Sequence, residues 1–264
     1  MSKITIGRLH KALNTRLRMA QRRAEDARFW WLTRSVQVGN SYRRIYFYHV
    51  RKAGGTSINH MFLGGKPVYS RLSKTHHYRM LNNDRVFVGW NQRIIEQGYY
   101  FYAFSHIPAH QLTLPPDTFT FTCLRDPARR VVSHYKMLLE TAHGLAPEHE
   151  SFTEESTWMG ENFGDFLDRI PREHLLNQLY MFSPSFDPDE AYDRITNCAH
   201  WFLTEQFEAG IATLSEKLGL DLKPLHTRRT SIDPQLTTAD HARLREVLAP
   251  EYVLYERLQA QKHA

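Results

Sequence analysis

The clearest pattern of apolar and polar positions lies between residues 46 and 62. An apolar run at residues 46–50 stops at a charged, glycine-rich turn. Apolar residues then return at helical spacing in Ile58, Met61 and Phe62. This order predicts a strand, a loop and the start of a helix.

The predicted loop is rich in residues that suit an anion. Gly54 and Gly55 let the backbone approach a ligand closely. Thr56 and Ser57 fit the N-cap of the following helix, where N–H groups point at a bound anion. Lys52 adds a full positive charge beside them. The sequence therefore predicts a loop that holds a phosphate-like group.

A second strand-to-helix transition follows farther along the chain. Residues Thr118–Leu124 are apolar and β-branched, as expected of a buried strand, and Asp126 and Pro127 form a strong helix start. Arg125 at the strand end and Ser133 on the second helical turn could hold a phosphate through N–H and O–H donors. Alternatively, Arg125 pairs with Asp126 or another carboxylate, and these residues alone do not decide between the two.

Between these motifs, two runs read as strands, at Arg85–Gly89 and Tyr99–Phe104. Pro108 cannot continue a central strand, so His106 lies where the second run enters a loop. Because ligands bind at the carboxyl ends of parallel strands, His106 is a candidate general base. Position alone favours a structural histidine, since the chain contains 15 histidines.

The remaining pattern fits one α/β domain with a helical appendage. A short strand is predicted at 201–203, a helix at 207–218, and closing helices near the C-terminus. Residues 141–165 are polar and predict a mobile loop on the substrate-binding side. We expect a basic helical tail and connector at residues 1–40 and the main domain at residues 41–264.

Composition narrows the classes of protein that fit. The chain is 42% hydrophobic and 23% charged, which is ordinary for a globular protein. Two cysteines make neither a disulfide framework nor a metal quartet, and no metal site is expected. Neither a membrane-spanning run nor a secretory signal is found, so we expect a cytoplasmic protein.

The net charge of +6 is confined to the tail. Residues 1–28 hold eight basic and two acidic residues, so the rest of the chain is neutral overall. No nucleic-acid partner is therefore expected. Leu9, Leu13 and Leu17 share one face of a predicted helix, which could lie on anionic lipid at the inner membrane surface. A solvated or domain-packed helix is the favoured alternative, with Trp30 and Trp31 packing the tail onto the domain.

Taken together, the motifs H-V-R-K-A-G-G-T-S and L-R-D-P-A-R-R-V-V-S-H-Y resemble those of sulfotransferases that use 3′-phosphoadenosine 5′-phosphosulfate (PAPS). The likeness is to the carbohydrate-acting branch that includes the heparan sulfate 2-O- and 6-O-sulfotransferases and bacterial relatives. The segment F-S-H-I-P-A-H resembles the family's G-H-x-P segment, whose histidine is the catalytic base. The resemblance implies a P-loop-like three-layer α/β sandwich with a central, mainly parallel sheet.

The chain departs from the family pattern at several positions. In the first motif, Arg51 stands in place of proline and Ala53 in place of threonine, and Ser105 stands where glycine is usual. In the segment that resembles D-N-x-x-x-R-x-L, Leu176 and Tyr180 take the places of the acid and the arginine. No function is carried over to that segment.

The resemblance also implies roles for the motif residues. The 5′-phosphosulfate would be held by Lys52, Gly54, Gly55, Thr56 and Ser57, and the predicted cofactor site includes their neighbours Arg51 and Ala53. Arg125 and Ser133 would hold the 3′-phosphate. His106 would be the base, and Lys52 would stabilise the leaving phosphate.

A late basic loop is the last candidate. Family members wrap such a loop over the nucleotide, which implies that Thr227, Arg228 or Arg229 contacts the phosphates. A solvated charge cluster is an equal alternative.

The expected function is transfer of a sulfuryl group from PAPS to a hydroxyl of a carbohydrate or glycolipid. Two alternatives remain open. One is a glycan- or membrane-binding protein that keeps the fold without catalysis. The other is a nucleotide-dependent kinase, which the lack of a G-x-x-x-x-G-K-[ST] motif disfavours.

Overall fold

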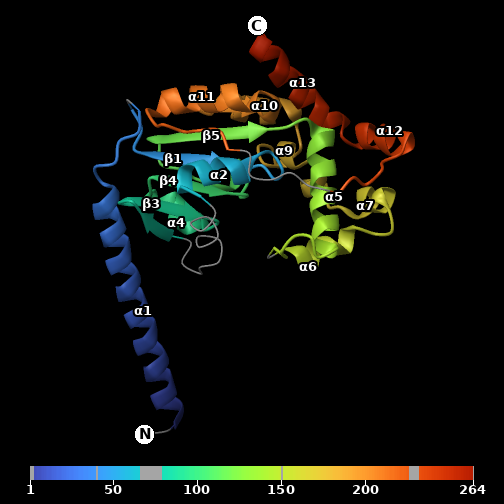
Figure 1. Ribbon diagram of the computed structural model, residues 1–264. Helices are drawn as coiled ribbons and strands as arrows, with labels where there is room; N and C mark the ends of the chain where they lie inside the picture. The colour runs from blue at the N-terminus through green and yellow to red at the C-terminus, as the bar shows by residue number, and fades with distance from the viewer. Residues whose placement is uncertain (1–2, 40, 66–78, 150, 226–231, 264) are drawn as a thin grey trace.

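A computed structural model describes residues 3–39, 41–65, 79–149, 151–225 and 232–263, with side chains described from residue 13 to residue 261 within those ranges. The described chain forms one six-stranded sheet flanked by helices (Figure 1). The strands are β1 (Arg44–Tyr48), β2 (Arg79–Asn82), β3 (Arg85–Gly89), β4 (Tyr102–Ser105), β5 (Thr118–Leu124) and β6 (His200–Leu203).

The sheet has the strand order β2-β3-β4-β1-β5-β6, and every pairing except β2–β3 is parallel. The predicted mainly parallel sheet is therefore confirmed. The edge strand β2 was not predicted, because it is short and two of its four residues are polar. It returns to β3 through Asn83 and Asp84, which both have positive φ, the backbone of a tight hairpin turn.

Helices cover both faces of the sheet, which confirms the three-layer sandwich. On one face, α2 (Gly55–Leu63) and α11 (Phe207–Leu218) pack on aromatic strand residues such as Phe47 and Phe121. The other face is covered by α4 (Gln92–Gln97), α5 (Pro127–Ala142), α10 (Pro188–Thr196) and α13 (Ala249–His263).

Smaller helices pack beside α5. They are α6 (Phe152–Glu155), α7 (Phe163–Arg169), α8 (Arg172–Leu175), α9 (Asn177–Tyr180) and α12 (Thr238–Val247). The expectation of a mobile loop at residues 141–165 was wrong for much of this segment. Residues 152–158 form helical turns, and Glu155 and Trp158 are buried.

The N-terminal helix α1 runs from Lys3 to Thr33 and projects from the edge of the sheet (Figure 1). It continues through residues that were expected to form the connector. Trp30 and Trp31 are about half exposed, so the expectation that they pack the tail onto the domain was wrong. The division of the chain at residue 40 stays a prediction. Within the described residues, no helix is both long and apolar enough to cross a membrane.

Candidate active site

The candidate residues of both motifs follow neighbouring strands. His49 comes directly after β1, His106 after β4 and Arg125 after β5. Strand β1 lies between β4 and β5, and Tyr48 is in register with Ser105 on one side and Thr122 on the other. The three residues therefore leave the sheet at the same edge, the ligand-binding edge of an open parallel sheet.

The first loop turns sharply between β1 and α2. Lys52 has a φ of 65° and Gly54 a φ of 77°, so both adopt the left-handed conformation. Gly54 is the N-cap of α2 and has no side-chain cap hydrogen bond. The prediction that Thr56 and Ser57 form the N-cap was therefore wrong. Both lie in the first turn of the helix, half-buried.

Position 55 requires a glycine because the ring of His49 lies against it. A Cβ atom at Gly55 would lie 1.8 Å from Nε2 of His49, and one at Gly54 would lie 3.3 Å from the ring of Phe207. The two glycines therefore leave room for the side chains of His49 and Phe207, which pack beside them. The first N–H groups of a helix have no intrahelical acceptor and point outward, toward an anion. With Lys52 beside them, these N–H groups could hold an anionic group.

Arg125 connects the second motif to this loop. Its Nη1 donates a hydrogen bond to the carbonyl oxygen of Lys52 at 3.2 Å. The side chain of Gln178 holds the Arg125 backbone from both sides: Oε1 accepts from N at 2.8 Å and Nε2 donates to O at 2.9 Å. Burial lowers the pKa of Arg125, and the nearby carboxylate of Glu205 partly offsets this.

Helix α5 begins as the sequence predicts. Asp126 is the N-cap, accepts a hydrogen bond from the N–H of Arg129, and is followed by Pro127. The proposed pairing of Arg125 with Asp126 is not the contact that the guanidinium makes, since Arg125 donates to Lys52. Ser133 lies half-buried on the second turn of α5.

His106 is held in one orientation by the backbone. Its Nδ1 lies 2.6 Å from the carbonyl oxygen of His49, so Nδ1 carries the proton and donates. Nε2 is then left with a lone pair. Burial and the charge of Arg51 together lower the pKa of His106 to about 4, although the hydrogen bond to His49 opposes them. A neutral imidazole with a basic Nε2 is the form that a general base requires.

The residue before this histidine explains one departure from the motif pattern. Ser105 is fully buried at the end of β4. Its hydroxyl lies 2.7 Å from the hydroxyl of Tyr46 and accepts a hydrogen bond from the N–H of Ile107 at 3.0 Å. A serine therefore satisfies its polar atom here and fixes the turn that carries His106.

A family model described as the sulfotransferase family matches residues 38–245. The chain belongs to the sulfotransferase family. The match spans β1 to α12 and includes both strand-to-helix motifs and His106. A comparison with curated proteins found no match.

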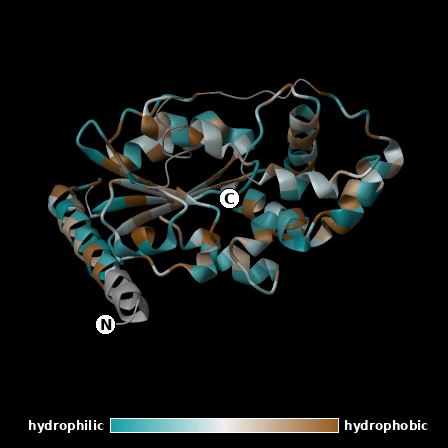
Figure 2. Ribbon diagram, turned by 90° about the horizontal axis from the view of Figure 1, so that it is seen from below, coloured by the Kyte–Doolittle hydropathy of each residue, from teal (hydrophilic) through white to brown (hydrophobic). Residues whose placement is uncertain are grey.

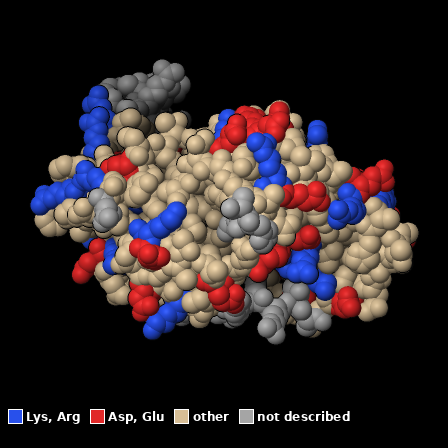
Figure 3. Space-filling model, turned by 90° about the horizontal axis from the view of Figure 1, so that it is seen from above, with Lys and Arg blue, Asp and Glu red and all other residues tan. Residues whose placement is uncertain are grey.

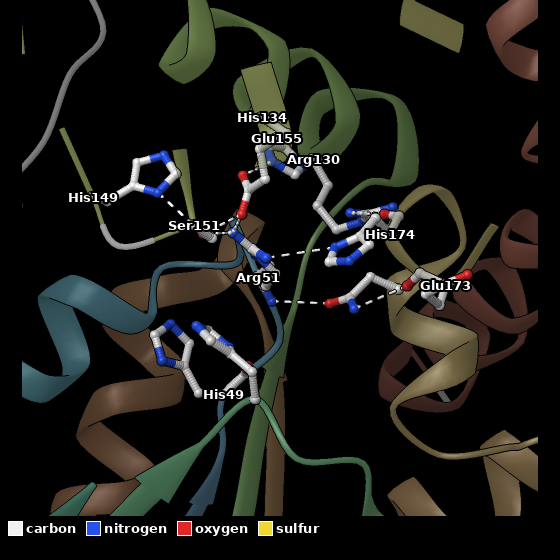
Figure 4. A network of polar contacts seen from close by, with 11 residues as sticks. His49, Arg51, Arg130, His134, His149, Ser151, Glu155, Glu173 and His174 are labelled. Atoms are coloured by element: carbon white, nitrogen blue, oxygen red, sulfur yellow. Dashed lines mark hydrogen bonds and ion pairs between the residues drawn. The ribbon is translucent and has the colours of Figure 1, made fainter. Parts of the chain in front are cut away.

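In this sulfotransferase, the side chain of Arg51 points into a network of polar contacts (Figure 4). Its guanidinium forms an ion pair with Glu155 and donates to Nδ1 of His174 at 3.5 Å. Its backbone N–H donates to Oδ1 of Asn177 at 3.1 Å. The residue that replaces the motif proline thus ties the loop to α6, α8 and α9. A role of Arg51 in holding the cofactor stays a prediction.

Glu155 is the buried centre of this network. It is 1% exposed and accepts hydrogen bonds from Ser151 and, at 2.8 Å, from Nε2 of His134. Burial raises the pKa of Glu155, but the hydrogen bond from His134 and the charge of Arg51 outweigh burial and lower it far below its usual range. Burial lowers the pKa of His134 to about 3, although the hydrogen bond that His134 donates to Glu155 opposes this shift. The pair is thus a carboxylate and a neutral imidazole.

A second buried ion pair is linked to Arg125 through Gln178. Arg130 and Glu251 are fully buried, with Nη2 and Oε2 at 3.4 Å. The other carboxylate oxygen of Glu251 accepts a hydrogen bond from the N–H of Gln178 at 2.7 Å. Helix α13 therefore positions the glutamine that holds Arg125.

Sequence reasoning missed Glu155, His134, His174 and Gln178. His134 lies inside the second motif, so its place one turn beyond Arg130 on a buried helix face was a usable signal. Glu155 carried no local signal, because its ion-pair partner Arg51 is 104 residues away in the chain.

The late basic loop lies outside the residues that the structure describes. Thr227, Arg228 and Arg229 are not among the described residues, so their contact with phosphates stays a prediction. Close to the end of this gap, Asp233 lies 3.9 Å from Nζ of Lys136 on α5. Lys136 is one turn beyond Ser133, so the described chain resumes beside the helix that carries Ser133.

Arg79, Arg93 and Trp158 are residues of types that often bind sugars, but each has contacts within the fold. Arg79 and Arg93 form ion pairs with Asp26 of α1, at 3.3 Å and 3.2 Å. Trp158 is buried, and its ring centroid lies 4.7 Å from that of His174. Among the described residues, no group of three or more His, Cys, Asp or Glu side chains is placed to hold a metal ion.

Proposed function

We propose that this sulfotransferase moves a sulfuryl group from PAPS to a hydroxyl of a carbohydrate or glycolipid acceptor. The observation that carries the proposal is the hydrogen bond from Arg125 to the carbonyl of Lys52. It joins a loop that fits one anionic group to a helix start that carries an arginine and Ser133. PAPS has two separate phosphate positions, which matches two anion sites side by side.

The cofactor would be held by residues of both motifs. Lys52, Thr56, Ser57 and the N-terminus of α2 would bind the 5′-phosphosulfate. Arg125 and Ser133 would bind the 3′-phosphate. When bound, PAPS supplies an electrophilic sulfur and a phosphate leaving group.

His106 would act as the general base. Its Nε2 would accept the proton of the acceptor hydroxyl while Nδ1 keeps its hydrogen bond to His49. Such proton transfer contributes about 10²–10⁴-fold in rate. Lys52 and the N–H groups of α2 would stabilise the negative charge that develops on the departing phosphate.

The carbohydrate acceptor rests on the motif resemblance and on the site's surroundings. The half-buried His106 lies near the polar network, because it is bonded to the carbonyl of His49, two residues before Arg51. The side chain of Arg51 in turn contacts Glu155 and His174. Polar donors and acceptors beside a base suit a substrate that carries many hydroxyl groups.

The donor is tested by comparing nucleotides. We expect adenosine 3′,5′-bisphosphate to bind at least about tenfold more tightly than AMP, because only the former reaches both anion sites. Isothermal titration calorimetry measures both affinities. Equal affinities would contradict the proposal. Transfer from labelled PAPS to a panel of saccharide and lipid-linked acceptors then identifies the acceptor.

The base is tested by His106→Ala. We expect transfer to fall by about 10²–10⁴-fold while nucleotide affinity stays the same. His110→Ala is the matched control, because His110 lies in the next turn and packs against Tyr180 instead. Loss of nucleotide binding together with turnover in His106→Ala would make the assignment of the base wrong.

A further inference from the structure

Helix α1 leaves most of its length uncovered. Every described side chain from residue 13 to residue 25 is exposed. The helix projects past the edge of the sheet near β3 (Figure 1). In proteins, most of the stability of a helix comes from the packing of one of its faces rather than from the helix alone. A surface outside this chain is therefore expected to cover part of it.

The last turns of α1 are fixed to the domain. Asp26 forms ion pairs with Arg79 and Arg93 and accepts a hydrogen bond from Gln97 at 3.1 Å. The guanidinium of Arg79 also lies 4.3 Å from the ring centroid of Phe29. These contacts set the rotation of the helix about its axis, so its outer face has a defined direction.

An apolar stripe runs along that outer face. Its members repeat at alternating steps of four and three residues: Leu13, Leu17, Ala20, Ala24, Ala27 and Trp31. This spacing keeps them on one side of a helix. All six are exposed.

The stripe faces away from the domain. Asp26 follows Ala24 by two positions, and Trp31 follows Phe29 by two, which is a rotation of about 200° around the helix axis. The residues that bind the domain and the stripe therefore lie on opposite sides of the helix. A partner on the stripe would leave the contacts of Asp26 intact. Figure 2 shows the mixture of hydrophobic and hydrophilic residues along the described part of α1.

Arginines border the stripe. Arg16 and Arg23 lie along one edge and Arg28 along the other, and all three are exposed. Long arginine side chains can reach outward to anionic groups while their stems lie along an apolar surface. By contrast, acidic and basic side chains are interspersed over the face of the molecule seen in Figure 3. Residues 1–28 account for the whole net charge of +6.

These charges argue against pairing with a second copy of the chain. The same spacing occurs in coiled coils, whose flanking positions usually carry opposite charges. Here the flanking charges Arg16, Arg23 and Arg28 are all basic, so two copies would place arginines against one another. Three of the six stripe residues are alanines, which bury little surface.

We propose that α1 binds the surface of an anionic lipid bilayer. The stripe would enter the boundary between headgroups and acyl chains, and the three arginines would contact lipid phosphates. Trp30 and Trp31, each about half exposed, suit this boundary because their rings are apolar and their N–H groups are polar. The domain would then lie on the water side of the helix.

The proposal is tested by cosedimentation of the full chain with vesicles. One set contains phosphatidylcholine alone, and the other contains phosphatidylcholine with phosphatidylglycerol. We expect binding to the anionic vesicles to be at least about tenfold tighter and to weaken with added salt. Equal binding to both vesicles, or binding to neither, would overturn the proposal.

A matched pair of variants tests the orientation. Arg16→Glu with Arg23→Glu reverses two charges at the edge of the stripe, and Arg18→Glu with Arg22→Glu reverses two on the opposite side. We expect Arg16→Glu with Arg23→Glu to reduce the affinity for anionic vesicles about tenfold relative to Arg18→Glu with Arg22→Glu. Equal losses would show that the stripe is not the contact face.

A third variant tests the apolar contact itself. Leu13→Glu with Leu17→Glu is expected to abolish binding to anionic vesicles and to leave nucleotide affinity unchanged, because neither residue lies near the site. Light scattering without lipid gives the oligomeric state. A dimer that the leucine variant dissociates, with no vesicle binding by the unaltered chain, would show that a second copy covers the stripe.

Discussion

The guanidinium of Arg51 forms an ion pair with the buried carboxylate of Glu155. This contact joins the loop after β1 to the short helix α6, two segments 104 residues apart at these positions. It exists because an arginine stands where the family motif has proline. The loop after β1 and the neighbouring small helices are therefore held together.

The first prediction concerns the stability of this pair. Glu155→Ala should lower the free energy of unfolding by about 2–3 kcal/mol, which is below the value for a fully buried pair because Arg51 keeps 18% of its exposure. Urea unfolding measures the change. If the pair is the cause, adding Arg51→Ala to Glu155→Ala should recover part of the loss. A double variant that is less stable than either single variant would contradict this.

A second prediction follows from the low pKa values in the network. In the unfolded chain His134 takes up a proton near the ordinary histidine pKa of 6.5, whereas in the folded protein burial keeps it neutral down to about 3. The unfolded state therefore binds more protons in this range, and stability falls as the pH drops from about 6.5. Below 4.5, Glu155 adds to the loss, because its folded pKa is depressed.

Thermal melts between pH 8 and pH 4 test this dependence. The melting temperature should be flat above pH 7 and fall below it. In His134→Gln the fall between pH 6.5 and pH 5 should be shallower, because one group that gains a proton on unfolding has been removed. An identical pH profile in the variant would show that His134 does not contribute.

The third prediction concerns the pH dependence of the reaction. Because the pKa of His106 is lowered to about 4, the acid limb of kcat/KM should lie well below 6.5. Arg51→Gln removes a positive charge that lowers this pKa, so the acid limb should move to higher pH. Arg93→Gln, whose charge pairs with Asp26 on α1, is the control and should leave it in place. The profile is measured with saturating donor.

A fourth prediction separates the two anion sites. Arg125→Ala should weaken the binding of adenosine 3′,5′-bisphosphate by about 10–100-fold, the value of a charge-assisted hydrogen bond. AMP lacks the 3′-phosphate, so its affinity should change little. Calorimetry on both nucleotides gives the ratio. A parallel loss for both nucleotides would instead indicate a general disturbance through Lys52.

Much of the fold was predictable because its signals are local. The run at residues 46–50 and the pair Asp126–Pro127 each specify an element through a few adjacent residues. The edge strand β2 was missed, since it has only four residues and its two apolar ones, Met80 and Leu81, are adjacent and do not mark one face. The N-cap of α2 was misplaced because Gly54 caps the helix through its backbone conformation, without a side chain.

The residues of the candidate site also fall into two groups: those with a local signal in the sequence and those without one. Lys52, Arg125 and His106 could be found because each follows a strand, and parallel strands bring their ends together. Glu155 and Gln178 could not, because their contacts depend on how the small helices pack against the sheet. Such packing is set by many distant residues and leaves no pattern in the segment itself.

The contact between Gly55 and His49 has a consequence for how this loop can vary. The imidazole of His49 occupies the space that any side chain at residue 55 would need. A mutation at position 55 alone meets the ring, so a larger residue there would be accepted only after His49 had become smaller. Residues 49 and 55 are therefore expected to change together in evolution. A side chain at position 55 is expected only in relatives whose residue 49 is smaller than histidine.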